Sequence, residues 1–273
     1  MRRRVLLAVA CLTVLVGCGG YDGDAPPGEE EVLTDPQGDE GLTGTLTVFA
    51  AASLTDVFTR LGEQLMEENP QLDVRFNVAG SSALAAQLLE GAPADVFAAA
   101  DEAQMSRVQD GGLIGAAELF AENPLMLAVP IENPAGVALP EGGMPSLSEL
   151  VTADMTVAVC APEVPCGAAA AEVLEASGRS DAPDTYEDDV RAVLTKVQLG
   201  EVDAGLIYLS DVHAAGDSIL AFAFREAPQA VNRYPIGALE DSANPDAARA
   251  FVDLVLSAEG QQVLADAGFL PPS

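Results

Sequence analysis

The chain has 273 residues, enough for one large core or two of moderate size, and its 43 acidic and 12 basic residues give a net charge of -31. Such an acidic chain argues against nucleic acid and against a polyanionic membrane surface as partners. The charge says little about the sign of a small ligand, because physiological salt screens it over about 8 Å; solubility or a salty medium explains it better.

The first residues have the pattern of an export signal. Three arginines at 2–4 precede an apolar run at 5–16 that is too short to span a bilayer. Leu15-Val16-Gly17-Cys18 follows, and this ending resembles the processing site of bacterial lipoproteins. The resemblance implies a signal peptide at 1–17 and lipidation of Cys18 outside the cytoplasmic membrane. A plain signal with an incidental cysteine is the alternative.

Residues 18–44 are rich in Gly, Pro, Asp and Glu and hold few large apolar residues. This composition is typical of a flexible acidic tether. We therefore expect the folded body to begin near Thr45.

Two cysteines remain for that body, because Cys11 lies in the signal and Cys18 would be lipidated. In an exported protein, Cys160 and Cys166 are expected to form a disulfide that staples the loop between them. Two free thiols are the alternative. A metal site fits less well, since no histidine or further cysteine lies close by in the sequence.

The body opens with a strand-to-helix turn at 47–56. An apolar run ends in three alanines, Ser53 follows, and apolar residues then recur with the spacing of one helix face. We expect Ser53 to cap this helix, with Asp56 completing a weak capping box. A helix start offers unpaired N–H groups and the positive end of the helix dipole, so small side chains there let an anion approach. An ordinary capped helix is the alternative.

Strands and helices alternate along the rest of the chain. We expect strands at 72–78, 93–99, 125–129, 156–160, 204–208 and 234–236, and helices at 83–90, from 101, and at 145–150, 168–176, 191–199 and 245–256, with a last turn at 261–264. The alternation predicts α/β layers around a mostly parallel sheet. We expect the chain to leave one lobe at Asn123-Pro124 and to return near Tyr234; no internal repeat is evident.

Seven segments in a fixed order carry a resemblance to a known family. They begin with Val-Phe-Ala-Ala-Ala-Ser-Leu-Thr at 48–55 and Ala-Gly-Ser-Ser-Ala-Leu-Ala-Ala-Gln at 79–87, and continue at 91–97, 123–125, 162–167, 189–191 and 205–208. Together they resemble the molybdate-binding proteins of bacterial molybdate ABC importers over roughly residues 45–273. The resemblance implies a type II periplasmic-binding-protein-like fold, with a ligand cleft between two lobes joined by two crossing strands. We expect lobe I at 45–124 plus 232–273 and lobe II at 125–231.

The same resemblance implies which residues hold an oxyanion. The expected ligands are hydroxyl and backbone donors of Ser53 and Ser81, the backbone N–H groups of Cys166 and Val190, and the Tyr208 phenol. Ser82 is a further candidate that shares or replaces the role of Ser81.

Cys166 stands where the family commonly has alanine; the backbone contact survives this change, but a disulfide can alter the loop. Asp95 belongs to the shared pattern, yet we expect a structural role, since a carboxylate beside a dianion would repel it.

The residue types agree with an oxyanion site, because the candidates lie at helix starts or at a strand end. A donor-rich, formally neutral site suits fully deprotonated molybdate, tungstate or sulfate. A phosphate that keeps a proton needs an acceptor, and leaving that proton unpaired costs about 1–3 kcal/mol. Taken singly, residues such as Ser53, Ser81 and Asp189 are most often helix caps, and a tyrosine such as Tyr208 is most often core packing. Only their joint order favours a ligand site.

Other functional classes fit less well. The only histidine is His213, expected in a surface loop, and no nucleophile elbow, phosphate loop or dinucleotide fingerprint occurs in the sequence. Asp188 and Asp189 are adjacent and would point apart, so they suggest no acid/base pair. A receptor for sulfate, an organic acid or a metal ion is the remaining alternative. For a metal ion, however, the turns carry hydroxyls rather than the clustered His or carboxylate ligands that a cation needs.

We therefore expect a lipid-tethered, extracytoplasmic, monomeric receptor with no catalytic residues, no metal site and no cofactor. It would close its two lobes around molybdate or tungstate and deliver the anion to an ABC permease and its ATPase.

Overall fold

The computed structural model describes residues 41–139 and 142–273. The expected signal peptide, Cys18 and most of the expected tether lie outside the described residues. The first strand begins at Thr43, two residues before the expected start near Thr45. Among the described helices, none combines the length and apolar character needed to cross a membrane.

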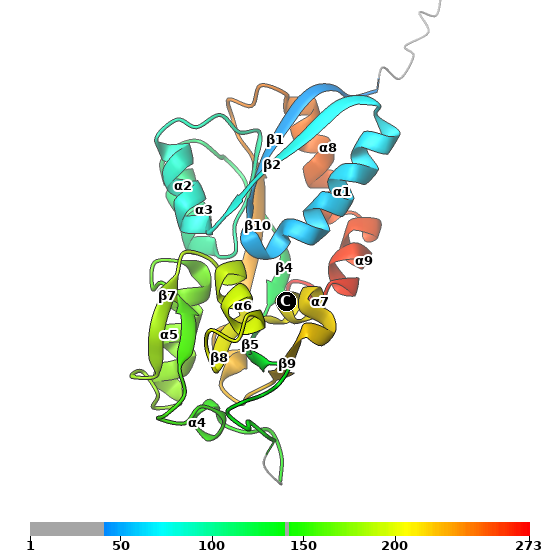
Figure 1. Cartoon of the computed structure of the whole chain (residues 1–273). Coiled ribbons are helices and arrows are strands. Elements are labelled where there is room, and N and C mark those ends of the chain that lie inside the picture. The colour runs from blue at the N-terminus through cyan, green and yellow to red at the C-terminus, as the bar shows by residue number, and fades with distance from the viewer. Residues whose placement is uncertain (1–40, 140–141) are drawn as a thin grey trace, which may run out of the picture. The chain divides into compact units, whose positions relative to one another are not determined.

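Two five-stranded sheets with helices packed around them form the described body (Figure 1). The strands are β1 (Thr43–Ala51), β2 (Gln71–Ala79), β3 (Val96–Ala98), β4 (Glu118–Asn123), β5 (Leu125–Pro130), β6 (Val157–Cys160), β7 (Pro183–Glu187), β8 (Ala204–Tyr208), β9 (Ile219–Phe222) and β10 (Asn232–Ala238). The helices are α1 (Thr55–Glu68), α2 (Ser81–Leu89), α3 (Glu102–Asp110), α4 (Leu147–Leu150), α5 (Pro165–Ala176), α6 (Val190–Gln198), α7 (Leu209–Ala215), α8 (Pro245–Leu256) and α9 (Ala258–Asp266). Short 3-10 helices are η1 (Ala52–Leu54), η2 (Gly216–Ser218) and η3 (Ala227–Gln229).

Both sheets repeat one pattern of strand directions. The first has the order β2-β1-β3-β10-β4, with β1 parallel to β2 and β3, and β10 antiparallel to β3 and β4. The second has the order β7-β6-β8-β5-β9, with β6 parallel to β7 and β8, and β5 antiparallel to β8 and β9. The expected α/β, two-lobed fold is confirmed. Each sheet is mixed, because one of its five strands, β10 in the first and β5 in the second, runs antiparallel to its neighbours. The two sheets thus share one strand topology, although the sequence shows no internal repeat.

Each sheet has its own hydrophobic core. The first core contains Phe58 and Phe251, whose rings meet edge to face at 5.2 Å between centroids. The second is built on β8, whose five residues are all buried, as in strands covered on both faces. Burial of each large apolar side chain contributes about 1.5–3 kcal/mol, so each sheet carries its own stabilising core. We call the β1 sheet with its helices α1–α3, α8 and α9 the first lobe, and the β6 sheet with α4–α7 the second lobe.

The chain passes between the lobes twice. It leaves the first sheet after β4 and enters β5 through Pro124, and it returns between β9 and β10. The Leu209 N–H donates to the Pro124 carbonyl at 3.0 Å, which ties the first crossing to the start of α7. The exact lobe division at 45–124 plus 232–273 and 125–231 stays a prediction.

Several local expectations differ from the structure. Helix α5 begins at Pro165 rather than 168, because proline is favoured in the first helical turn, so Cys166 is helical rather than in a loop. His213 is exposed as expected, but it lies on α7 rather than in a loop. Helix α9 extends well beyond the expected turn at 261–264. Strands β4, β7 and β9 were not expected.

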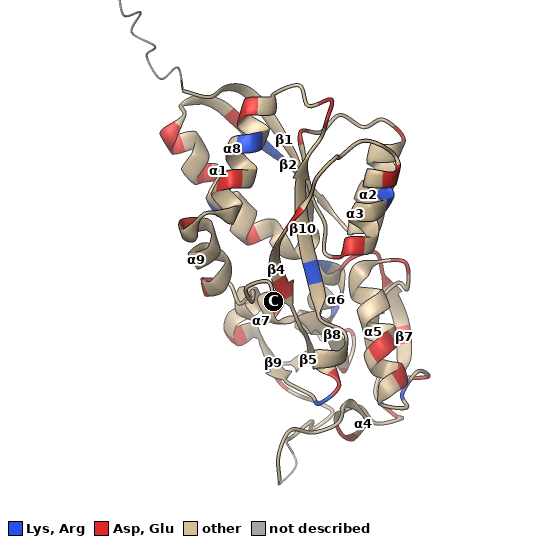
Figure 2. Ribbon diagram, turned by 180° about the vertical axis from the view of Figure 1, so that it is seen from behind, with Lys and Arg blue, Asp and Glu red and all other residues tan. Residues whose placement is uncertain are grey.

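Charged side chains are spread over both lobes, with acidic residues far more common than basic ones (Figure 2). Within the described residues, no cluster of histidine, cysteine and carboxylate side chains is suited to a metal ion.

Candidate functional site

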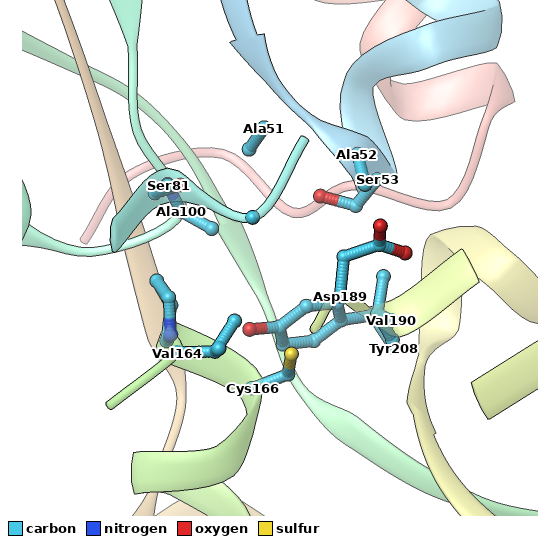
Figure 3. Close-up of a pocket in the computed structure, with 12 residues that line it drawn as sticks. Ala51, Ala52, Ser53, Ser81, Ala100, Val164, Cys166, Asp189, Val190 and Tyr208 are labelled. Carbon is cyan, nitrogen blue, oxygen red and sulfur yellow. The ribbon is translucent and has the colours of Figure 1, made fainter. Parts of the chain in front are cut away.

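Four helix starts meet at one cavity between the lobes (Figure 3). Two of these starts belong to the first lobe, at η1 and α2, and two belong to the second lobe, at α5 and α6. The lining residues are Ala51, Ala52, Ser53, Gly80, Ser81, Ala100, Val164, Pro165, Cys166, Asp189, Val190 and Tyr208. The structure thus brings Ser53, Ser81, Cys166, Val190 and Tyr208 together. Ser82 is only half-buried and is not among the lining residues.

The cavity is small, with a volume of about 10 Å³. This is close to the space that a single water molecule requires. A larger ligand therefore needs the two lobes to part, and each added atom increases that movement.

Ser53 lies inside a helical turn and does not cap a helix. The cap of η1 is Ala51, and no side chain caps η1 or α1. The expected cap at Ser53 and the capping box with Asp56 are therefore wrong, because the 3-10 turn η1 intervenes between β1 and α1. The Ser53 side chain is buried and its Oγ lies 2.9 Å from the hydroxyl oxygen of Tyr234.

Ser81 is the first residue of α2, and Gly80 precedes it without any side-chain cap. The Ser81 Oγ accepts a hydrogen bond from the Ala100 N–H at 2.9 Å. A Cβ on Gly80 would overlap the carbonyl oxygen of Asp188, which belongs to the second lobe. Glycine therefore allows the start of α2 to approach the opposite lobe.

The start of α5 is held by a disulfide. Cys160, at the end of β6, is bonded to Cys166 in the first turn of α5, with 5.6 Å between their Cα atoms. This confirms the expected pairing. Because the first N–H groups of a helix have no partner within it, α5 presents backbone donors to the cavity beside Cys166.

The start of α6 is capped by Asp189, whose carboxylate accepts a hydrogen bond from the Ala192 N–H at 2.9 Å. Val190 follows as the first helical residue and is buried. Asp189 also lines the cavity, so a carboxylate lies near the place of an anion. The positive end of the α6 dipole offsets part of that charge.

Tyr208 ends β8 with its side chain almost fully buried. Figure 3 shows its phenol among the other lining residues. Among the described residues its hydroxyl has no hydrogen-bond partner, and burial raises the pKa of Tyr208 well above its ordinary value. The phenol therefore keeps its proton, and a ligand oxygen that accepts this proton would relieve a cost of about 1–3 kcal/mol.

Asp95 has the structural role that we expected. One carboxylate oxygen accepts the Thr47 N–H at 2.7 Å, and the other accepts the Ser242 hydroxyl at 2.7 Å and the Asn244 N–H at 3.1 Å. The side chain is buried away from the cavity lining. Asp95 thus joins β1 to the segment that follows β10.

Sequence reasoning missed the residues behind Ser53. Tyr234 on β10 and Asn123 at the end of β4 are fully buried, and the Asn123 Nδ2 lies 3.3 Å from the Tyr234 hydroxyl oxygen. Asn123 and Tyr234 were singled out only as the places where the chain crosses between lobes. Because 181 positions separate Ser53 from Tyr234, no local pattern reveals the contact.

An ion-pair network lies next to the site and joins the lobes. Arg191, the second residue of α6, pairs with Asp56 on α1 at 2.6 Å and with Asp211 on α7 at 3.0 Å. The Arg191 Nε and the Asp211 oxygen are close but are not aligned as a hydrogen bond. Burial raises the pKa of Asp211 to about 6, although the Arg191 charge acts in the opposite direction.

Comparison with known proteins gives a consistent result. Residues 46–270 match the family described as bacterial extracellular solute-binding protein. The chain is 39% identical over 268 residues to the molybdate-binding protein ModA of Mycobacterium tuberculosis, covering 98% of this chain and 97% of that protein.

Two solved structures show similar folds. The periplasmic molybdate-binding protein of Azotobacter vinelandii has a TM-score of 0.73 at 20% identity and covers 84% of this chain and 100% of that chain. The sulfate-binding protein SubI of Mycobacterium tuberculosis has a TM-score of 0.66 at 15% identity, covering 83% of this chain and 86% of that chain. At these identities the likeness concerns the fold alone, so the ligand must be argued from the cavity.

Proposed function

Since the chain belongs to the bacterial extracellular solute-binding protein family, we propose that it binds molybdate in the cavity between its two lobes. The family is one of solute-binding proteins, and the chain is not an enzyme. The observation that carries the proposal is the meeting of four helix starts and two serine hydroxyls around one small cavity. Apart from the Asp189 carboxylate, the polar groups that line the cavity can all donate hydrogen bonds.

The proposed ligands are the five lining residues expected from the sequence. Ser53 and Ser81 donate from the first lobe; the N–H groups of Cys166 and Val190 and the phenol of Tyr208 donate from the second. Because the Ser81 oxygen already accepts the Ala100 N–H, its own proton is available for a ligand. Donors from both lobes on one anion would hold the lobes together.

Ion selection follows from this set of donors. Molybdate is fully deprotonated at neutral pH and requires only donors. Phosphate keeps at least one proton at neutral pH, and an unpaired proton in the cavity costs about 1–3 kcal/mol. Tungstate has the same charge and shape as molybdate, so we propose that it binds to the same residues.

Sulfate is the remaining alternative among oxyanions. It also requires only donors, and the fold is shared with a sulfate-binding protein. The likeness to a molybdate-binding protein at 39% identity over nearly the whole chain favours molybdate.

We further propose how the receptor is used. Lipidation at Cys18 would tether it outside the cytoplasmic membrane, and as a monomer it would deliver molybdate to an ABC permease and its ATPase. The residue pattern at 15–18 and the extracellular family support this. Residues 45–124 plus 232–273 and residues 125–231 would be the two bodies that open and close.

Calorimetric titration of the exported protein tests the proposal. Molybdate and tungstate should bind about 5- to 150-fold more tightly than phosphate, given the cost of the unpaired proton. Sulfate should bind more weakly than molybdate. No heat with molybdate, or tighter binding of phosphate, would overturn the proposal.

A further inference from the structure

A chain of buried hydrogen bonds lies behind Ser53. From Ser53 it passes to the Tyr234 hydroxyl at 2.9 Å, then to the Asn123 side-chain amide at 3.3 Å, and on to the Ser210 hydroxyl at 2.8 Å. We call these four residues the buried relay. They are at most 3% exposed and come from η1, β10, β4 and α7, so the relay joins the cavity to both crossings between the lobes.

One backbone group fixes the direction of the relay. The Ser210 N–H can only donate, and it lies 3.3 Å from the Asn123 Oδ1. The amide oxygen of Asn123 must therefore face that N–H, which places the Nδ2 group toward the two hydroxyls. Because Nδ2 can only donate, the hydroxyl oxygens of Ser210 and Tyr234 both act as acceptors toward Asn123.

Among the groups within hydrogen-bond distance of the Tyr234 oxygen, only the Ser53 Oγ can accept its proton, because the Asn123 Nδ2 can only donate. Burial also raises the pKa of Tyr234 well above its ordinary value, so the phenol keeps its proton. Tyr234 therefore donates to Ser53, and the proton of the Ser53 hydroxyl is left to point elsewhere.

We infer that Tyr234 and Asn123 are positioning residues that present Ser53 to the cavity as a hydrogen-bond donor, an inference that rests on the proposed function. Neither residue is among those that line the cavity, so each acts through Ser53. With one of its two lone pairs engaged by Tyr234, Ser53 directs its proton rather than a free lone pair toward the cavity. The relay thus makes Ser53 selective for fully deprotonated oxyanions.

The packing around Tyr234 keeps its hydroxyl in place. Its ring meets those of Phe120, Tyr208 and Phe269 edge to face, with centroids 6.2, 6.1 and 5.5 Å away. Replacement by phenylalanine keeps this ring and removes only the hydroxyl. The variant Tyr234→Phe therefore isolates the hydrogen bond from the packing.

A double-mutant cycle on the exported protein tests the inference. Molybdate affinity is measured by calorimetry for the unaltered protein, Ser53→Ala, Tyr234→Phe and the double variant. Tyr234→Phe should weaken molybdate binding about 3- to 10-fold in the unaltered protein, and it should cause almost no further loss in Ser53→Ala. Tyr186→Phe, an exposed tyrosine on β7, is the matched control and should leave affinity unchanged.

The selectivity between molybdate and phosphate would not change if Tyr234 had a purely structural role. Once Tyr234 no longer donates to it, Ser53 can turn its lone pair toward a protonated oxygen. The ratio of molybdate to phosphate affinity, with phosphate measured by displacement of molybdate, should therefore fall in Tyr234→Phe. Equal weakening of both ions would overturn the inference.

Asn123→Asp provides a second variant if Tyr234→Phe folds poorly. A carboxylate accepts where the amide donates, so Tyr234 would turn its proton toward residue 123 and Ser53 would then donate to Tyr234. The loss of molybdate affinity should be larger than for Tyr234→Phe and should shrink in the Ser53→Ala background. A loss of equal size in both backgrounds would reflect the added charge alone and would overturn the inference.

The outcomes separate the inference from the proposed function. No molybdate binding by the unaltered protein overturns both. Molybdate binding that is unaffected by Tyr234→Phe, or is weakened equally with and without the Ser53 hydroxyl, overturns the inference and leaves the proposed function standing.

Discussion

The two lobes share one sheet topology but contribute different donors to the cavity. Both lobes present helix starts, but the first lobe adds two serine hydroxyls, and the oxygens of Ser53 and Ser81 are each held by a buried partner. The second lobe presents backbone N–H groups at the starts of α5 and α6, together with the Tyr208 phenol. A hydroxyl can rotate and must be oriented by its neighbours, whereas a backbone N–H is oriented by the helix itself.

This difference predicts that the two lobes tolerate different changes. Cys166 can replace the alanine common in the resembling family, because its proposed contribution is a backbone N–H that any side chain leaves in place. Ser53 depends on residues from two other elements to fix its proton. The second lobe instead holds a buried charge next to the site, in the pair of Arg191 and Asp211.

The largest expected effect concerns that buried charge. Burial raises the pKa of Asp211 to about 6 from 3.8, so the folded state holds a proton that the unfolded state has lost between these pH values. The free energy of unfolding should therefore fall as pH rises from about 4 to about 6, by up to about 3 kcal/mol relative to Asp211→Asn. Urea denaturation of both proteins at several pH values measures this difference. Parallel pH profiles would show that Asp211 titrates normally.

A smaller effect is expected at the second-lobe phenol. Tyr208→Phe removes a donor to a charged ligand, which is worth about 1.5–3 kcal/mol, so molybdate should bind about 10- to 100-fold more weakly. Because the buried hydroxyl has no described partner, the ligand-free variant should be as stable as the unaltered protein or more so. Calorimetry and thermal unfolding measure the two quantities. A loss of stability together with unchanged affinity would assign Tyr208 to the core alone.

Removing the disulfide tests whether residue 166 contributes its backbone N–H rather than its side chain. Replacing both Cys160 and Cys166 by alanine removes a short loop closure and should lower the free energy of unfolding by about 2 kcal/mol. Because the N–H at residue 166 remains, molybdate affinity should fall less than it does in Ser53→Ala. Denaturation and calorimetry on the pair of variants check this ranking, and a larger loss in the cysteine variant would contradict it.

The smallest effect is expected for the ion pair between the lobes. Asp56 is mostly exposed, so Asp56→Asn should change the free energy of unfolding by no more than about 1 kcal/mol. If the pair helps to hold the lobes together, molybdate affinity should fall less than about 5-fold and the loss should decrease at high salt. Asp73→Asn, which alters an exposed pair within the first lobe, is the control. A loss that salt does not change would argue against an electrostatic contribution.

Strongly patterned elements were predictable from the sequence. The boundaries of β8 and α8 match the expectation at 204–208 and 245–256, because each has a clear apolar pattern and a proline or turn at its edge. Strands β4 and β9 were missed because they are only partly buried and lack a strict alternation. Without them, the outer antiparallel pairing of each sheet, β10 with β4 and β5 with β9, was not predictable.

The cavity was predictable only in part. The ordered resemblance located the five candidate residues that the structure brings together around it. The partner of Ser53 was not predictable, because Tyr234 is distant in sequence and its strand was marked only as a return crossing. Gly80 was seen as part of a small-residue turn, but its contact with Asp188 requires the two lobes in place.

Crystals of the exported protein grown with tungstate would test the central claim most directly, because tungsten can be located by its anomalous scattering. We predict one strong peak in the cavity, with ligand oxygens within about 3 Å of the Ser53 and Ser81 hydroxyls, the N–H groups of Cys166 and Val190, and the Tyr208 phenol. A peak outside this cavity, or an anion that contacts only one lobe, would contradict the account.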